Sequence, residues 1–169
     1  EYLSSLEENS SEMEAFYNSL NLHRPFSPKD FSLVKETLLN HLVPELIKLG
    51  KKNIKIEILC AGSGYESLLI SYFLENYIQE KNLDIIFQIF AKEAFEKNSN
   101  SYMFRPINIS FLEDYGSYIE KEKLTYKKEG RLYFKNRYRK NIIYSKGVFT
   151  EGPYLLSSDV VILFDKLNL

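Results

Sequence analysis

The segment IKIEILCAGSGYES, residues 54–67, joins an alternating apolar run to a turn of small residues. Ile54, Ile56, Ile58 and Cys60 recur at every second position, which is the pattern of a β-strand. The AGSG sequence that follows allows a sharp turn because glycine accepts backbone conformations that other residues avoid. We therefore predict a strand that enters a turn.

The sequence after this segment contains further helix and strand patterns. Residues 68–78 carry an apolar stripe at helical spacing, and LDIIFQIFA (83–91) and DVVILF (159–164) are apolar runs typical of buried parallel strands. We predict an α/β fold with about three parallel strands, at 54–60, 83–90 and 159–164. An all-helical structure would contradict this prediction.

Helices are expected to flank the sheet. A helix should begin at Ser27-Pro28-Lys29-Asp30 and run to Gly50 with a kink at Pro44. AKEAFEKNSNSY (91–102) should form a second helix that packs on the sheet. Ser110 and Glu113 have capping-box spacing, so ISFLEDYGSYIE (109–120) is expected to form a short helix.

A small antiparallel β-subdomain is predicted at about 120–146. LTYKKEGRLYFK (124–135) has the pattern of a hairpin that turns at Gly130, and YRKNIIYS (138–145) supplies a third β-prone run beside it. Residues 1–26 are expected to be a helical remnant or linker, and 27–169 one domain. The chain starts at Glu1 and stops at Leu169 after an apolar run, so we expect further native sequence or a homo-oligomer.

Composition excludes several classes of function. No run of eighteen apolar residues is present, so we expect a soluble protein without membrane insertion. The chain has 22 basic and 23 acidic residues, so its net charge creates no strong electrostatic field around the whole molecule. Nucleic acid is therefore not expected as a partner. One cysteine and two histidines exclude a disulfide and a multi-histidine or cysteine zinc site, so no metal is predicted.

The turn at residues 61–64 is the main candidate for a ligand site. Gly62 and Gly64 would let a ligand approach the backbone, and the N-terminus of the next helix offers N–H groups that lack acceptors within the helix. Such geometry suits a nucleotide-like ligand at the carboxyl end of the first strand. A ligand loop and a plain tight turn are equally supported by the motif, whereas a phosphate loop is not, because no Gly-Lys-Ser/Thr follows.

The segment CAGSGYES resembles the cofactor loop of the chemotaxis-receptor (CheR-type) methyltransferase family. LYFKNRYRKNIIYSKGVF and SSDVVILFDKLNL resemble that family's β-subdomain and its fourth strand, and NSLNLHRPFSPKDF resembles its entrance to the catalytic domain. The resemblance covers about residues 18–169. It implies a partial Rossmann-like class I methyltransferase sheet, S-adenosylmethionine as the cofactor, and methyl transfer to glutamates of a chemoreceptor cytoplasmic region.

The resemblance also assigns residues. The cofactor-binding positions that it implies are Ala61, Gly62, Ser63, Gly64, Glu66, Glu93 and Asp165, and Arg24 stands near the position of an expected catalytic arginine. The chain departs from the family elsewhere. The expected ribose-binding carboxylate falls on Ile89–Ala91, with Glu93 slightly late, and the expected adenine-binding Asn falls near Gly147 or Val148. The expected Arg-Asn pair after the fourth strand falls on Phe164-Asp165.

Two functions therefore stay open. The first is a receptor-glutamate methyltransferase that the missing polar contacts would make weak or inactive. The second is a non-catalytic protein with the same fold that binds another protein or regulates it. Lys121–Lys146, in which basic and aromatic residues alternate, would suit an acidic peptide or a nucleic acid, although a solvated hairpin face is the favoured interpretation.

Overall fold

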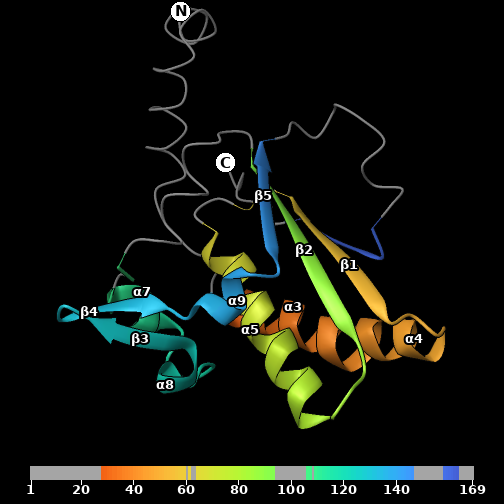
Figure 1. The fold of residues 1–169 in the computed structure, drawn as a ribbon, viewed down its shortest axis with the longest axis horizontal. Helices are drawn as coiled ribbons and strands as arrows, with labels where there is room; N and C mark the ends of the chain where they lie inside the picture. Colours follow the sequence, from red (N-terminus) through yellow and green to blue (C-terminus); the bar gives the residue numbers. More distant parts are fainter. Residues whose placement is uncertain are drawn as a thin grey trace, which may run out of the picture.

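The computed structural model describes residues 28–59, 61, 64–93, 106–107, 109–146 and 158–163. The proposed boundary between residues 26 and 27 lies outside these ranges and stays a prediction. A four-stranded sheet lies at the centre of the described part, and a two-stranded sheet stands apart from it (Figure 1). The α/β class predicted from the sequence is confirmed.

The four-stranded sheet has the order β5-β2-β1-β6, and every pairing in it is parallel. Its strands are β1 (Asn53–Leu59), β2 (Ile86–Glu93), β5 (Ile142–Lys146) and β6 (Val160–Leu163). The predicted strands at 54–60, 83–90 and 159–164 correspond to β1, β2 and β6. β2 starts and ends about three residues later than predicted, so Ala91, Lys92 and Glu93 are strand residues and not the start of a helix.

The pairing of β5 differs from the prediction. The run at 138–145 is predicted from the sequence to lie beside the hairpin, but Ile142–Lys146 pairs with β2 in the parallel sheet. Residues Asn136–Arg139 instead form a short helix, α9, which separates this strand from the hairpin. The hairpin itself is confirmed: β3 (Thr125–Lys128) and β4 (Arg131–Phe134) are antiparallel and turn at Glu129-Gly130.

The first helical segment departs from α-helical geometry just before Pro44, and the kink predicted there stays a prediction. α3 (Pro28–Thr37) passes into a π-helical segment (Leu38–Leu42) and then into α4 (Val43–Lys48). The N–H of Val43 reaches back to the carbonyl of Leu38, and Pro44 has no N–H to continue the normal helical ladder. The remaining helices are α5 (Tyr65–Glu80), α7 (Ile109–Asp114) and α8 (Lys121–Leu124).

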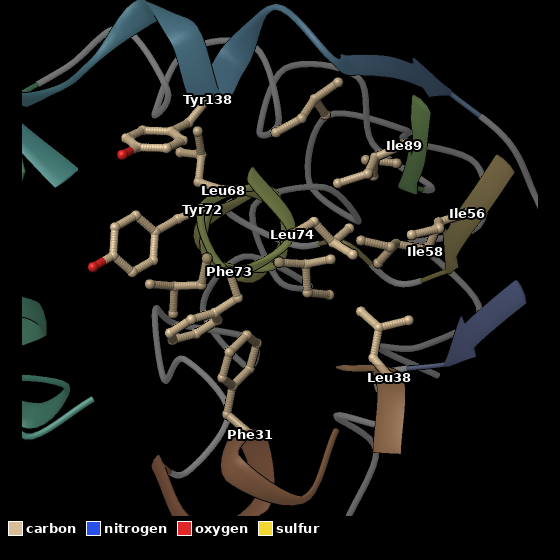
Figure 2. Close-up of a cluster of buried hydrophobic side chains, with 14 of the residues drawn as sticks. Phe31, Leu38, Ile56, Ile58, Leu68, Tyr72, Phe73, Leu74, Ile89 and Tyr138 are labelled. Atoms are coloured by element: carbon tan, nitrogen blue, oxygen red, sulfur yellow. The ribbon is translucent and has the colours of Figure 1, made fainter. Parts of the chain in front are cut away.

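α5 is the centre of the hydrophobic core. In Figure 2 its side chains face three neighbours: Leu74 lies toward β1, Phe73 toward Phe31 of α3, and Tyr72 toward Tyr138 of α9. The ring centroids of Phe73 and Phe31 are 5.9 Å apart, and those of Tyr72 and Tyr138 are 5.3 Å apart. Because neighbours surround it, α5 is buried without interruption from Glu66 to Leu74, polar residues included.

The two faces of the sheet differ in burial. Ile54, Ile56 and Ile58 of β1 face the helices and are fully buried. Their neighbours in the parallel register alternate in the same way, so Ile143, Val161 and Leu163 lie on the opposite face, and each is at least 42% exposed. The described helices therefore cover one face of the sheet.

Candidate functional site

The turn between β1 and α5 is held by backbone hydrogen bonds. The N–H of Gly64 donates to the carbonyl of Ala61 at 2.9 Å, and the N–H of Ala61 donates to the carbonyl of Lys92 on β2 at 3.0 Å. Gly64 then caps α5 with φ at +82°, a left-handed conformation that favours glycine. The turn is thus fixed at the carboxyl edge of the sheet.

Tyr144 of β5 packs directly against Gly64. Its hydroxyl donates to the carbonyl oxygen of Gly64 at 3.2 Å, and the same oxygen accepts the N–H of Leu68 at 3.1 Å. A Cβ placed on Gly64 would lie 2.7 Å from the Tyr144 Oη and 3.1 Å from two ring carbons. Both backbone conformation and space therefore require glycine at position 64.

Glu66 lies in the first turn of α5 and is completely buried. A carboxylate is stabilised at this end of a helix by the helix dipole. Burial raises the pKa of Tyr144, the neighbouring Ser67 hydroxyl opposes this rise, and the charge of Glu66 adds to it. Tyr144 is therefore a neutral hydrogen-bond donor next to a buried carboxylate.

Glu93 is the last residue of β2. Leu59 pairs in register with Lys92, so the backbone of Glu93 lies at the carboxyl edge where the Ala61–Gly64 turn leaves β1. The residues at the position expected for the ribose carboxylate are internal to the strand, and Ile89 and Ala91 are fully buried. Glu93, and not the Ile89–Ala91 stretch, thus occupies the strand end.

Four proposed site residues lie outside the described residues: Arg24, Gly62, Ser63 and Asp165. Cys60, Gly147 and Val148 also lie outside them. Ala61, Gly64, Glu66 and the backbone of Glu93 are described, and they share one edge of the sheet. The roles that the resemblance gives them stay predictions.

A second polar cluster lies on the opposite face of the sheet. Glu57 of β1 is 2% exposed and forms an ion pair with Lys92 of β2. The Ser158 hydroxyl donates to the other carboxylate oxygen of Glu57 at 3.1 Å. Sequence reasoning singled out neither this cluster nor Tyr144 as a neighbour of the turn, because each joins residues far apart in the chain.

The described ranges show whether this part of the chain has a cluster of metal ligands or a helix that could span a membrane. Within them, no group of three or more His, Cys, Asp or Glu residues is arranged to hold a metal ion. The helices in the same ranges are too short or too polar to cross a bilayer.

The candidate site therefore consists of a glycine-capped helix N-terminus, a buried carboxylate, a neutral tyrosine and a strand that ends in glutamate, all at one sheet edge. Comparison of the sequence with protein-family models and with curated proteins finds no match.

Proposed function

We propose that this chain has a Rossmann-like methyltransferase fold and binds S-adenosylmethionine at the Ala61–Gly64 turn. Numbered along the chain, the parallel strands have the order 3-2-1-4, which is the order at the start of doubly wound nucleotide-binding sheets. In such sheets the ligand binds outside the carboxyl ends of the strands, where the order reverses. Here the order reverses at β1, and the turn that leaves β1 is the observation that carries the proposal.

The residues at this edge suit parts of the cofactor. In the proposed site the first-turn N–H groups of α5 and the Glu66 carboxylate bind the amino-acid part, and Glu93 binds the ribose hydroxyls. Arg24 and Asp165 complete the set that the resemblance implies. S-adenosylmethionine would supply an electrophilic methyl group on a sulfonium.

The proposed reaction is methyl transfer to a glutamate side chain in the cytoplasmic region of a chemoreceptor. Bound S-adenosylmethionine would supply the methyl group to a carboxylate oxygen of that glutamate, and the carbon–sulfur bond would break to give an ester and S-adenosylhomocysteine. A carboxylate is already a nucleophile at neutral pH, so the protein needs to align the two groups and exclude water. This function places the protein in the cytoplasm.

Two observations favour a second candidate, a non-catalytic protein of the same fold that binds or regulates another protein. Glu66 is fully buried, and Gly64 is required by contact with Tyr144 whether or not a ligand binds. Both residues therefore have a structural role that does not depend on a cofactor.

Calorimetric titration with S-adenosylhomocysteine tests the binding site. We expect binding that Gly64→Val abolishes, and a loss of roughly 10- to 150-fold in Glu66→Gln, which keeps the shape of the side chain but removes its charge. Gly130→Val is the matched control, because Gly130 has a similar positive φ and a Cβ at that position would meet no atom within 4 Å. Thermal melts of each variant show whether it is folded.

The outcomes separate the two candidates. Binding of the product together with methyl transfer to a receptor fragment supports the enzyme. Binding without transfer supports the non-catalytic candidate. A folded wild-type protein that does not bind S-adenosylhomocysteine would overturn the cofactor site and with it the methyltransferase proposal.

A further inference from the structure

The β3–β4 hairpin presents two different faces. Thr125 and Phe134, which pair across the strands, are 5% and 0% exposed, so their face packs inward. Phe134 contacts the ring of Tyr65 at the start of α5, with centroids 5.5 Å apart. Because side chains alternate along a strand, the outward face carries two cross-strand pairs: Tyr126 with Tyr133, and Lys128 with Arg131.

The aromatic pair on this outward face is stacked and partly open to solvent. The rings of Tyr126 and Tyr133 have centroids 5.6 Å apart and planes inclined by 26°. Tyr126 is 40% exposed. An aromatic surface is therefore available at the side of the hairpin, which projects away from the four-stranded sheet beside α7 and α8 (Figure 1).

The basic pair is unfavourable for the hairpin itself. Lys128 and Arg131 are directly opposite each other, and like charges in that position destabilise a sheet. Among the described residues, neither of them nor Lys127 forms an ion pair. An anion placed over the pair would relieve the repulsion.

The segment that contains the hairpin is much more basic than the chain as a whole. Residues 121–140 contain nine Lys or Arg and two Glu, a local charge of +7, whereas the whole chain carries −1. The overall charge balance therefore excludes a strong electrostatic field around the whole chain, but residues 121–140 still create a positive field locally. A field of this kind attracts polyanions at short range.

We propose that the outward face of the β3–β4 hairpin binds single-stranded nucleic acid. Lys128 and Arg131 contact phosphates, and a base stacks on the Tyr126–Tyr133 pair. Of the polyanions that the charge attracts, one with an aromatic base beside each phosphate matches both pairs at once. An acidic peptide matches only the basic pair. This proposal does not depend on the cofactor site.

Fluorescence anisotropy with a labelled single-stranded oligo-dT tests the proposal on the full chain. We expect binding whose logarithm falls linearly with the logarithm of salt concentration. Lys128→Gln and Arg131→Gln should each reduce the slope by about 0.7, the value for one phosphate contact on a single strand. Tyr126→Ala should weaken binding roughly 5- to 150-fold. Lys29→Gln, an exposed lysine on α3, should change neither quantity.

A charge reversal separates binding from folding. Lys128→Glu replaces the repulsive pair with an attractive one, so we expect an unchanged or higher melting temperature together with loss of oligonucleotide binding. Absence of salt-dependent binding by the wild type would overturn the proposal. So would equal affinity for poly-glutamate with no effect of Tyr126→Ala, because the face would then be a site for acidic peptides. Duplex DNA that binds as tightly as the single strand would also overturn it, since a paired base cannot stack on the tyrosines.

Discussion

The hydroxyl of Tyr144 donates a hydrogen bond to the carbonyl oxygen of Gly64, 3.2 Å away and 80 positions earlier in the chain. Tyr144 lies on β5 at one edge of the sheet, and Gly64 caps α5 at the turn after β1. The contact fixes the N-terminus of the central helix against a strand that follows the hairpin in the chain. The conformation of the candidate ligand turn therefore depends on the correct placement of β5.

Gly64→Ala should destabilise the protein more than alanine does at other left-handed glycines. The left-handed conformation costs alanine about 1–2 kcal/mol, and the new Cβ would lie 2.7 Å from the Tyr144 Oη, so the ring must also move. Gly130→Ala carries the conformational cost alone, because its Cβ would meet nothing within 4 Å. Urea denaturation of both variants measures the difference in unfolding free energy.

A double variant checks the cause of that difference. Gly64→Ala combined with Tyr144→Phe removes the nearest clashing atom, so the two substitutions should be coupled by about 0.5–3 kcal/mol. Equal destabilisation by alanine at positions 64 and 130, with no coupling, would show that the contact with Tyr144 has no energetic importance.

Tyr144→Phe should have an effect that depends on pH. The substitution removes the hydrogen bond to Gly64 and should cost about 1 kcal/mol at pH 8. Burial raises the pKa of Tyr144, so the folded protein keeps the phenol neutral where the unfolded chain, with a pKa near 10, loses its proton. The contribution of the phenol is therefore complete below about pH 10 and is lost as pH rises further.

Urea midpoints between pH 8 and pH 11 measure this effect. The stability difference between wild type and Tyr144→Phe should shrink over that range, because phenylalanine has no proton to lose. Tyr126→Phe is the matched control, because it removes the same hydroxyl group from a tyrosine that is 40% exposed. A constant difference for Tyr144→Phe would contradict the buried, neutral phenol.

The central part of the fold could be predicted from local sequence because its patterns are long. The alternation at 54–60, the helical stripe after Gly64 and the apolar runs near 86 and 160 each specify an element type, and the Glu129-Gly130 turn specifies a hairpin. The partner of β5 could not be predicted in this way. IIYSK is a short β-prone run that suits either sheet, and only the tertiary contacts of α9 and α5 assign it to β2.

Local sequence pattern predicts the candidate site only where it lies within one segment, and Glu93 on β2 is reached through the family resemblance instead. Ala61, Gly64 and Glu66 are close in sequence, so the motif brings them together. Tyr144 is 80 positions from Gly64, and Lys92 is 35 positions from Glu57. No local pattern encodes such pairs, because they arise from strand order and register.

Lys92→Met should be strongly destabilising. It removes the ammonium group that pairs with Glu57, which is 2% exposed. The Ser158 hydroxyl is then the remaining side-chain partner of this buried carboxylate within the described part of the chain. Breaking a buried pair in this way typically costs about 3–5 kcal/mol. The unfolding free energy from urea titration measures the loss.

The double variant Glu57→Met/Lys92→Met should recover most of that stability. Glu57 is flanked in register by Phe90 and Val161, so two apolar side chains would extend an apolar surface. A double variant as unstable as Lys92→Met would show that the ion pair itself, and not the burial of an unpaired charge, determines stability at this face.

Asp159→Asn should reduce the stability of the protein at pH values where the Asp159 carboxylate is ionised. The Asp159 side chain pairs with Lys51 at 2.8 Å and accepts the backbone N–H of Lys55 at 2.9 Å, at the point where β6 joins β1. The Lys51 ammonium and then the Lys55 N–H lower the pKa of Asp159 below its ordinary value. Stability from this group is therefore present above the unfolded pKa of about 3.9 and is lost as pH falls through the lower, folded value.

At pH 7 we expect Asp159→Asn to cost about 1.5–3 kcal/mol, the usual contribution of hydrogen bonds to a charged group. The difference from wild type should shrink as pH falls below the unfolded pKa and disappear where the carboxylate is protonated in both states. Asp84→Asn is the matched control, because Asp84 forms an ion pair with Lys52 over the same distance of 2.8 Å. The side chains of Lys52 and Asp84 are 77% and 93% exposed, so the loss of stability should be much smaller. Chemical denaturation of both variants from pH 2.5 to pH 7 makes the comparison. A loss that stays undiminished at pH 2.5 would mean that Asp159 stabilises the β1–β6 junction through its shape and not through its charge.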